Sequence, residues 1–263
     1  MDRTDSVDSV DGKAPRPLKP RVLALVAQGQ AEQQAFIEKL SAAERAALGA
    51  PDAWAAKDHI AHNAAWKADA AREIATTARG ETPEPTPSIT VFNPRVFTEY
   101  QHQSWDAILA GASQADEALR SALEACSEDD LSDPARFPWR EGLPLWTTAL
   151  VSGYEHPAEH YAQFYLESGD VALARTIREE AIETARRFIG ETEEFGYMVY
   201  NLGCFYANIG RPGLAIGALR DSFASAPSLR EGIRDDPELV SLRGDPAFQA
   251  LVGDGGGSVR RVS

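Results

Sequence analysis

The sequence predicts an all-α protein, a four-helix bundle followed by a short array of helical hairpins. Apolar residues recur at spacings of three and four along most of the chain, which is the period of a helix with one buried face. Alanine, the strongest helix former, dominates the segment WAAKDHIAHNAAWKADAAREIATTARG. A pattern that starts at Phe164 returns at Phe205, an offset of 41 residues, which indicates a repeated helical unit.

Composition limits the partners and the compartment. The chain has 263 residues, 43% of them hydrophobic, which is enough for a sizeable core. The formal net charge of −14 argues against nucleic acid or an anionic membrane as a partner, because both attract clustered Lys and Arg. Its two cysteines, Cys126 and Cys204, are far apart and form no CxxC motif, so we expect a reduced cytoplasmic chain without disulfides.

The first part of the chain predicts a tail and two helices. Residues 1–18 are acidic and polar, and we expect them to be disordered. A helical pattern covers 20–48, where LSAAERAALG either ends the helix or adds a short second one. The next helix is expected to start at Pro51-Asp52, with Asp52 as N-cap, and to stop at Gly80.

A proline-bearing loop, ETPEPTPS, leads into the second half of the bundle. The segment ITVFNPRVFTEY is expected to be an ordered loop that enters a helix after Pro94, and this helix continues to about residue 125. SEDDLSDP is interpreted as a turn with Leu131 as its buried anchor, and FPWREGLPLW as an irregular aromatic segment. Pro144 fits the first turn of the last bundle helix, which runs to Ser168-Gly169.

The C-terminal third contains a unit that is used twice. In its second copy the residues at the spacings typical of a helical repeat are Leu202, Gly203, Tyr206, Ala215, Leu219 and Pro227, and this pattern resembles the tetratricopeptide repeat. The stretches FYLESGDVALARTIREEAIETA and FYANIGRPGLAIGALRDSFASA align without a gap, and Leu173, Ala174, Leu214 and Ala215 are expected to be buried in equivalent positions. DDPEL and GDPAF each predict a short helix with an Asp cap and Pro in the first turn. The resulting division is a bundle over 19–168, a repeat region over 169–252 and a disordered tail over 253–263.

Three histidines form the main candidate site. His156 and His160 are four residues apart, which places both rings on one face of a helix, one turn apart. His62 on the second helix can face them across a bundle, because side chains of facing helices meet in the bundle core. Three neutral imidazoles with one open position suit Zn²⁺, Ni²⁺ or Fe²⁺. Ala55, His59, His62 and Trp66 fall on one helical stripe.

The segment DAWAAKDHIAHNAAW resembles the second-helix motif of the DinB-like four-helix bundle superfamily, in which a Trp precedes the metal histidine by eight residues, as Trp54 precedes His62. In that superfamily an HxxxH motif on the fourth helix supplies two more ligands, here His156 and His160. The stretch from VFNPRVF to FPWREGLPLW most resembles the ClbS/DfsB group. The resemblance covers about residues 20–168. It implies a divalent metal on these histidines and a hydrolase or thiol transferase acting on a small molecule, in detoxification or self-protection.

Further residues are candidates around this site. Glu159 precedes His160 and is a candidate general base, with a solvated helix position as the alternative. Trp139, Arg140, Tyr154 and Trp66 are candidates for substrate binding at a pocket mouth, although Trp139 also fits a core position.

Two features leave alternatives open. Pro157 directly follows His156, so the helix either kinks, aided by Gly153, or restarts at Pro157 with His156 outside it. His59 lies one turn before His62 and is expected on the exposed helix surface, with substitution for His62 or hydrogen bonding at the site as the alternatives. His102 is expected on the surface.

A second hypothesis assigns the chain to a different class of protein. Helical repeats serve mostly in protein contacts, so the repeat region can instead take a peptide or a second copy of the chain, with the bundle as a platform. In that case the protein is a binding or scaffold module that has a protein partner or forms a homodimer. The metal content separates the two hypotheses.

Overall fold

A computed structural model describes residues 17–253. Over this range the chain forms twelve α-helices and no β-strand, which confirms the all-α prediction. The α-helices are α1 (Leu18–Lys39), α2 (Ala42–Ala46), α3 (Ala56–Ala78), α4 (Ile89–Tyr100), α5 (Trp105–Ala125), α6 (Glu128–Ser132), α7 (Trp146–Leu150), α8 (His156–Glu167), α9 (Val171–Ile189), α10 (Glu193–Asn208), α11 (Pro212–Ser225) and α12 (Pro246–Gly253). Short 3₁₀ turns occupy η1 (Pro138–Arg140), η3 (Pro227–Glu231) and η4 (Pro237–Leu242), and a π-helical turn occupies η2 (Val151–Glu155).

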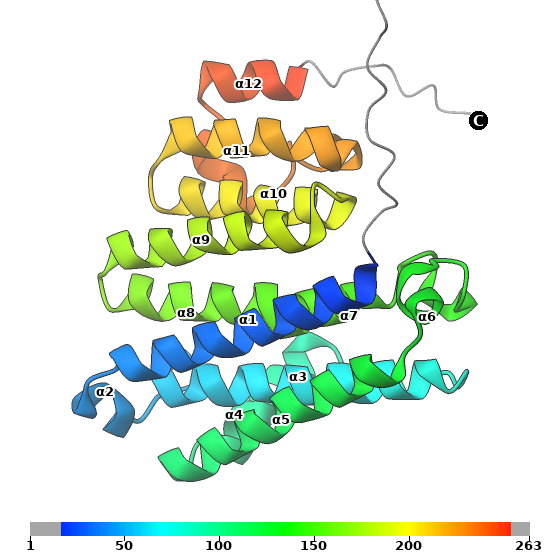
Figure 1. Cartoon of the computed structure of the whole chain (residues 1–263). Helices are drawn as coiled ribbons and strands as arrows, with labels where there is room; N and C mark the ends of the chain where they lie inside the picture. The colour runs from blue at the N-terminus through cyan, green and yellow to red at the C-terminus, as the bar shows by residue number, and fades with distance from the viewer. Residues whose placement is uncertain (1–16, 254–263) are drawn as a thin grey trace, which may run out of the picture.

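The helix α8 lies between two groups of helices. Figure 1 shows α1, α3 and α5 on one side of it, and α9, α10, α11 and α12 stacked in chain order on the other. One hydrophobic cluster continues from Leu25 on α1 through Ile182 on α9 to Leu251 on α12. A second cluster joins Phe36 and Ile60 to the α8 aromatic residues and Ala174. Burial of these apolar side chains is the main stabilising term, and it ties α8 to both groups.

The helix starts differ from the prediction at α3. The chain from Pro51 to Ala55 is not helical, because Ala50 and Ala53 exchange backbone hydrogen bonds of 2.8 and 3.0 Å. The helix therefore begins at Ala56, and the N-terminal backbone is capped by Asp58, whose carboxylate accepts from the Ala55 N–H at 2.9 Å. The prediction that Asp52 caps this helix was wrong. Asp58, the third residue of α3, provides the carboxylate that accepts at the N-terminus.

The segment ITVFNPRVFTEY is helical rather than an ordered loop. The helix α4 starts at Ile89 and contains Pro94 in its interior. Phe92 and Val96 on either side of the proline are both 3% exposed, and the burial of this face offsets the lost backbone bond. The helix predicted over 95–125 is also divided, because α4 ends at Tyr100 and Ser104 caps α5 by accepting from the Ala107 N–H at 3.2 Å.

The predicted turn SEDDLSDP is the short helix α6. Ser127 and Asp130 form a capping box that starts it, with each side chain accepting from the backbone N–H of the other. Leu131 is fully buried, so its predicted role as an anchor is confirmed.

The helix through His156 neither restarts at Pro157 nor leaves His156 outside. The turn before the proline is π-helical, and His156 donates its N–H to the Val151 carbonyl, five residues back. His156 keeps helical dihedrals, with φ −58° and ψ −43°. The Gly153 carbonyl, which would have accepted from residue 157, faces Gly29 on α1, where a Cβ would come within 2.4 Å of the oxygen. A glycine on α1 thus allows the close approach that covers the bulge.

The two predicted hairpins, α8–α9 and α10–α11, share their turn. Gly169 and Gly210 have φ of +89° and +69°, the left-handed conformation that ends a helix. Ala174 and Ala215 are both fully buried, as predicted, because helices cross closely there. Leu214 is 46% exposed, so its predicted burial was wrong. Its neighbour Ala215 takes the helix-facing position.

The C-terminal helices begin as predicted. Asp236 caps η4 by accepting from the Glu238 N–H at 2.8 Å, and Pro246 starts α12. The tails predicted over 1–18 and 253–263 lie outside the described residues, except for Pro17, Leu18 and Gly253. Leu18 begins α1 and Gly253 ends α12, so the tails were predicted one residue too long at these ends. Among residues 17–253, no helix combines the length and the apolar composition needed to cross a bilayer.

Candidate metal centre

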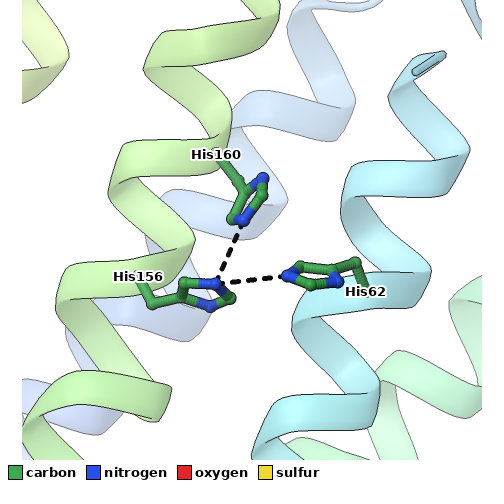
Figure 2. Close-up of side chains that lie close together, drawn as sticks. All are labelled: His62, His156 and His160. Atoms are coloured by element: carbon green, nitrogen blue, oxygen red, sulfur yellow. Dashed lines mark hydrogen bonds between the residues drawn. The ribbon is translucent and has the colours of Figure 1, made fainter. Parts of the chain in front are cut away.

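The helices α3 and α8 bring the three predicted histidines together. His156 Nε2 lies 3.2 Å from His62 Nε2 and 3.1 Å from His160 Nε2. Figure 2 shows the two α8 rings turned toward the His62 ring on α3. One ligand nitrogen from each residue lies within 4.8 Å of the other two, so this group can hold a metal ion. His62 is buried, whereas His156 and His160 are half-buried.

The spacing of the nitrogens fits metal coordination better than hydrogen bonding among the rings. Ligands about 2.0–2.1 Å from a tetrahedral zinc lie about 3.3 Å from one another, close to the observed separations. A neutral imidazole nitrogen carries either one proton or one lone pair, so His156 Nε2 cannot pair well with two neighbours at once. A cation at the centre of the three nitrogens uses all three lone pairs.

All three rings are neutral at physiological pH. Burial lowers the pKa of His156 to about 4. Burial, and then the charges of His156 and His59, lower the pKa of His62 to about 3. The pKa of His160 is lowered further by burial and by its three histidine neighbours. Because only a neutral imidazole can bind a metal, the site is ready for a cation without first releasing protons.

Two tryptophans pack against the histidines. The Trp54 ring stacks on His160, with centroids 5.6 Å apart and planes at 13°. The Trp66 ring lies 6.2 Å from that of His62 and 5.9 Å from that of His156. In the irregular aromatic segment, Phe137 packs on Trp139, with ring centroids 5.5 Å apart. Of the four predicted substrate-binding residues, Trp66 is the one that the structure brings to the histidines.

His59 is a fourth histidine of the cluster, contrary to the exposed position predicted for it. Its side chain is fully buried, and its Nδ1 lies 3.1 Å from His160 Nδ1. Burial lowers its pKa to about 4. The shared stripe of Ala55, His59, His62 and Trp66 was the signal in the sequence, since it placed His59 on the same face as His62.

Glu159 faces α9 rather than the histidine nitrogens. Its carboxylate pairs with Arg178 at 2.8 Å, and Arg178 is buried. Consecutive helical residues point about 100° apart, so Glu159 is turned away from the face that carries His160. The solvated position considered as the alternative fits in part, because the Glu159 side chain is 37% exposed while Arg178 holds its carboxylate. Its role as a general base stays a prediction.

Arg140 and Trp139 lie at the start of the segment that leads to α7. Arg140 pairs with Glu73 on α3 and donates to the Thr148 hydroxyl at 3.0 Å. It therefore fastens η1 to α3 and α7. Trp139 is 38% exposed, so the core position considered for it was wrong.

Tyr154 is buried between α1 and α9. Its hydroxyl lies 3.2 Å from a Glu32 carboxylate oxygen and 3.4 Å from the Ala181 carbonyl, and it donates to these acceptors. Burial, followed by the Glu32 charge, raises the pKa of this hydroxyl. The hydroxyl is therefore directed at helices other than α3, which supplies His62.

A second group with metal-ligand atoms is Cys204, Asp236 and Glu238. Here the Asp236 carboxylate already accepts from the Tyr200 hydroxyl at 2.7 Å and from the Glu238 N–H at 2.8 Å. Burial and the two carboxylates raise the pKa of the Cys204 thiol, which disfavours the thiolate that binds metals. Cys126 and Cys204 are both buried free thiols. The histidine cluster is therefore the better metal site.

The sequence matches no protein-family model, and searches of the curated proteins and of the solved structures find no match either. No family is thus identified by comparison. Function must be argued from the histidine cluster and its surroundings.

Proposed function

We propose that the protein is a metal-dependent enzyme that binds one divalent ion through His62, His156 and His160. The convergence of their Nε2 atoms, at 3.1 and 3.2 Å around His156, supports this proposal. Zn²⁺, Ni²⁺ and Fe²⁺ all accept imidazole ligands. When bound, such an ion supplies Lewis acidity, which activates water or a thiol at neutral pH.

The residues beside the histidines and the resemblance to the DinB-like superfamily support a small-molecule substrate. His156 and His160 are half-buried, and Trp54 and Trp66 provide apolar aromatic surface beside them. Hydrolysis or thiol transfer on a small molecule, in detoxification or self-protection, fits this surface and the ClbS/DfsB-like sequence pattern. In this proposal α1, α3, α5 and the α7–α8 segment are the four bundle helices.

The chain's own residues prepare the site for the ion. Burial keeps the three imidazoles neutral, so that their lone pairs are available at physiological pH. The π-helical turn keeps His156 on the same helix as His160, and Gly29 allows α1 to pack on that turn. Trp54, stacked on His160, restricts the rotation of its ring.

The test is element analysis of the full chain purified without a histidine tag. We expect about one equivalent of a divalent metal per chain. His62→Ala, His156→Ala and His160→Ala should each reduce the occupancy sharply. His102→Ala is the matched control, since His102 is exposed and is not one of the three proposed ligands, and it should retain full occupancy. A wild-type chain that binds no divalent metal under any loading condition would reject the proposal.

A second candidate is a binding or scaffold module that uses the tetratricopeptide-like hairpins. The observation that favours it is a 530 Å³ pocket between α8 and α10, lined in part by Gln163, Asn201, Phe205 and Asn208. Amides and an aromatic ring in the lining of such a pocket suit a peptide or a second copy of the chain. Capture of a defined partner or a concentration-dependent dimer by metal-free protein would favour this candidate.

A further inference from the structure

We propose that His59 is a positioning residue that determines which nitrogen of His160 is presented to the metal. This inference rests on the proposed metal site and adds to it a residue outside the three ligands. The His160 ring is contacted at both nitrogens: its Nε2 lies 3.1 Å from His156 Nε2, and its Nδ1 lies 3.1 Å from His59 Nδ1.

The contact between the two Nδ1 atoms requires a single proton between them. A neutral imidazole carries its proton on one nitrogen, and a hydrogen bond needs one donor and one acceptor. If His160 carries the proton on Nδ1 and donates it to His59, its Nε2 lone pair is free for a metal. If His59 donates instead, the proton of His160 moves to Nε2, and the ring cannot bind at that atom.

Metal binding and the direction of this hydrogen bond are therefore linked. An ion held by His160 Nε2 requires the proton on His160 Nδ1, and His59 Nδ1 is placed to accept it. A residue that hydrogen-bonds the other nitrogen of a ligating histidine fixes the tautomer and the orientation of its ring. Among residues 17–253, His160 is the ligand whose distal nitrogen has such a side-chain partner, while His62 Nδ1 is buried without one.

The surroundings of His59 allow it to accept. Its side chain is fully buried, and within the described chain its Nε2 has no hydrogen-bond partner. When Nδ1 accepts, the proton of His59 lies on this Nε2. The ring stands edge to face with Trp54 at 5.4 Å and with Phe164 at 6.1 Å, and aromatic faces are weak acceptors for an N–H group. His59 is then a neutral acceptor, and the rings of Trp54 and Phe164 hold it in place.

The test uses substitutions that keep or remove the acceptor atom. The side-chain oxygen of Asn occupies the position of a histidine Nδ1, and that of Gln occupies the position of Nε2. His59→Asn therefore retains the acceptor toward His160, whereas His59→Gln misplaces it and His59→Phe removes it. Zinc affinity of the tag-free full chain is measured by competition with a chelating dye. We expect His59→Asn to bind about as tightly as wild type, and the Gln and Phe variants about 10–100-fold more weakly.

A second readout separates positioning from packing. In the zinc-loaded protein, ¹⁵N chemical shifts should show His160 protonated at Nδ1 and coordinated through Nε2. A residue needed only for packing would lower the melting temperature of the metal-free protein while leaving the zinc affinity unchanged. If the Gln and Phe variants fail to fold, the His160 tautomer in wild type and in His59→Asn still decides the matter.

Several results would overturn the proposal. One is equal zinc affinity in the Asn, Gln and Phe variants. Another is coordination of zinc through His160 Nδ1. The third is an Asn variant that binds zinc as weakly as the Phe variant does. A failure of the metal site itself is distinguishable, because then wild type binds no zinc and the ligand variants His62→Ala and His156→Ala change nothing.

Discussion

In the α8–α9 hairpin the Asp170 N–H donates to the Tyr165 carbonyl, and in the α10–α11 hairpin the Arg211 N–H donates to the Tyr206 carbonyl, both at 2.8 Å. The two turns are thus the same, 41 residues apart. The helix faces before the turns differ. The positions of His156 and His160 on α8 are taken on α10 by Tyr197, which is 43% exposed, and by Asn201.

The neighbours of each hairpin explain this difference. α8 packs on α3, and α3 supplies His59 and His62 to the shared cluster. α10 packs on α9, α11 and η4, and Asn201 donates its amide to Glu155 at 3.0 Å. The hairpin provides a scaffold at both places, but a site forms where a further helix faces it with complementary side chains.

Substitution in the buried polar cluster beside α8 should cause the largest loss of stability. Tyr161 donates its hydroxyl to Gln33, and Lys67 pairs with Asp116 at 2.7 Å, with both charges buried. At the position of Tyr161 the second hairpin has the buried Leu202. Lys67→Ala leaves the Asp116 charge buried without a partner and should cost about 3–5 kcal/mol of unfolding free energy, measured by urea denaturation.

The matched control is the double variant Lys67→Met with Asp116→Leu, which removes both charges and keeps the volume. It should recover most of the lost stability. If Lys67→Ala alone unfolds at the same urea concentration as wild type, the ion pair contributes nothing to stability. The surroundings of the two hairpins would then tolerate substitution equally well.

Acidification should lower the free energy of unfolding through the buried histidines beside α8. The folded-state pKa of His59 and His156 is about 4, below the ordinary value of 6.5, so the unfolded chain binds more protons between these values. The stability that these two histidines contribute to the metal-free protein is therefore fully present above about pH 6.5. It is lost as the pH falls toward 4, by up to about 1.4 kcal/mol per pH unit for each histidine. Urea denaturation in EDTA from pH 7.5 to 5 measures this slope.

Glu155 acts in the opposite direction over part of this range, because burial and then Glu159 raise its pKa to about 7. The control is therefore a difference between two proteins. His59→Asn lacks one of the titrating groups, and its stability should fall less steeply with acid than that of wild type. Identical slopes would contradict the assignment of the effect to this histidine.

The close helix crossing in the second hairpin should give a smaller effect. At Gly203 on α10 a Cβ would lie 2.9 Å from Leu219 Cγ, whereas the first hairpin has the buried Ala162 at the same position. Gly203→Ala should therefore destabilise the protein by about 1–3 kcal/mol through overpacking. Gly217→Ala on α11 is the control, since nothing lies within 4 Å of its Cβ. It should raise the stability by up to about 1 kcal/mol, and thermal unfolding compares the two variants.

The last prediction is that a histidine pair placed on α10 does not bind metal. Tyr197→His with Asn201→His copies the spacing of the histidine pair onto α10, in a chain that also carries His156→Ala and His160→Ala. Metal content should stay at the background level of the double alanine variant, because α3 and His62 do not face α10. Restored binding of one equivalent would show that the pair on a helix is sufficient, and that α3 is not needed.

Local pattern alone determined much of this protein. The helical periods, the prolines and the glycines at Gly169 and Gly210 predicted the all-α fold and both hairpin turns, since these signals depend on backbone dihedrals and on neighbours in the chain. The spacing of His156 and His160 predicted a shared helix face, and the expected bundle placed His62 on a helix that can face it, as the resemblance also implied. The structure brings all three together.

Tertiary structure decided what the local pattern left open. Pro157 was tolerated because α1 approaches the π-helical turn at Gly29, a contact between residues far apart in the sequence. Pro94 stayed inside α4 because Phe92 and Val96 are buried beside it. His59 was expected at the surface, yet α8 covers it and places His160 Nδ1 against its ring. Burial and pairing depend on which helices meet, and a residue's own neighbours in the chain do not contain that information.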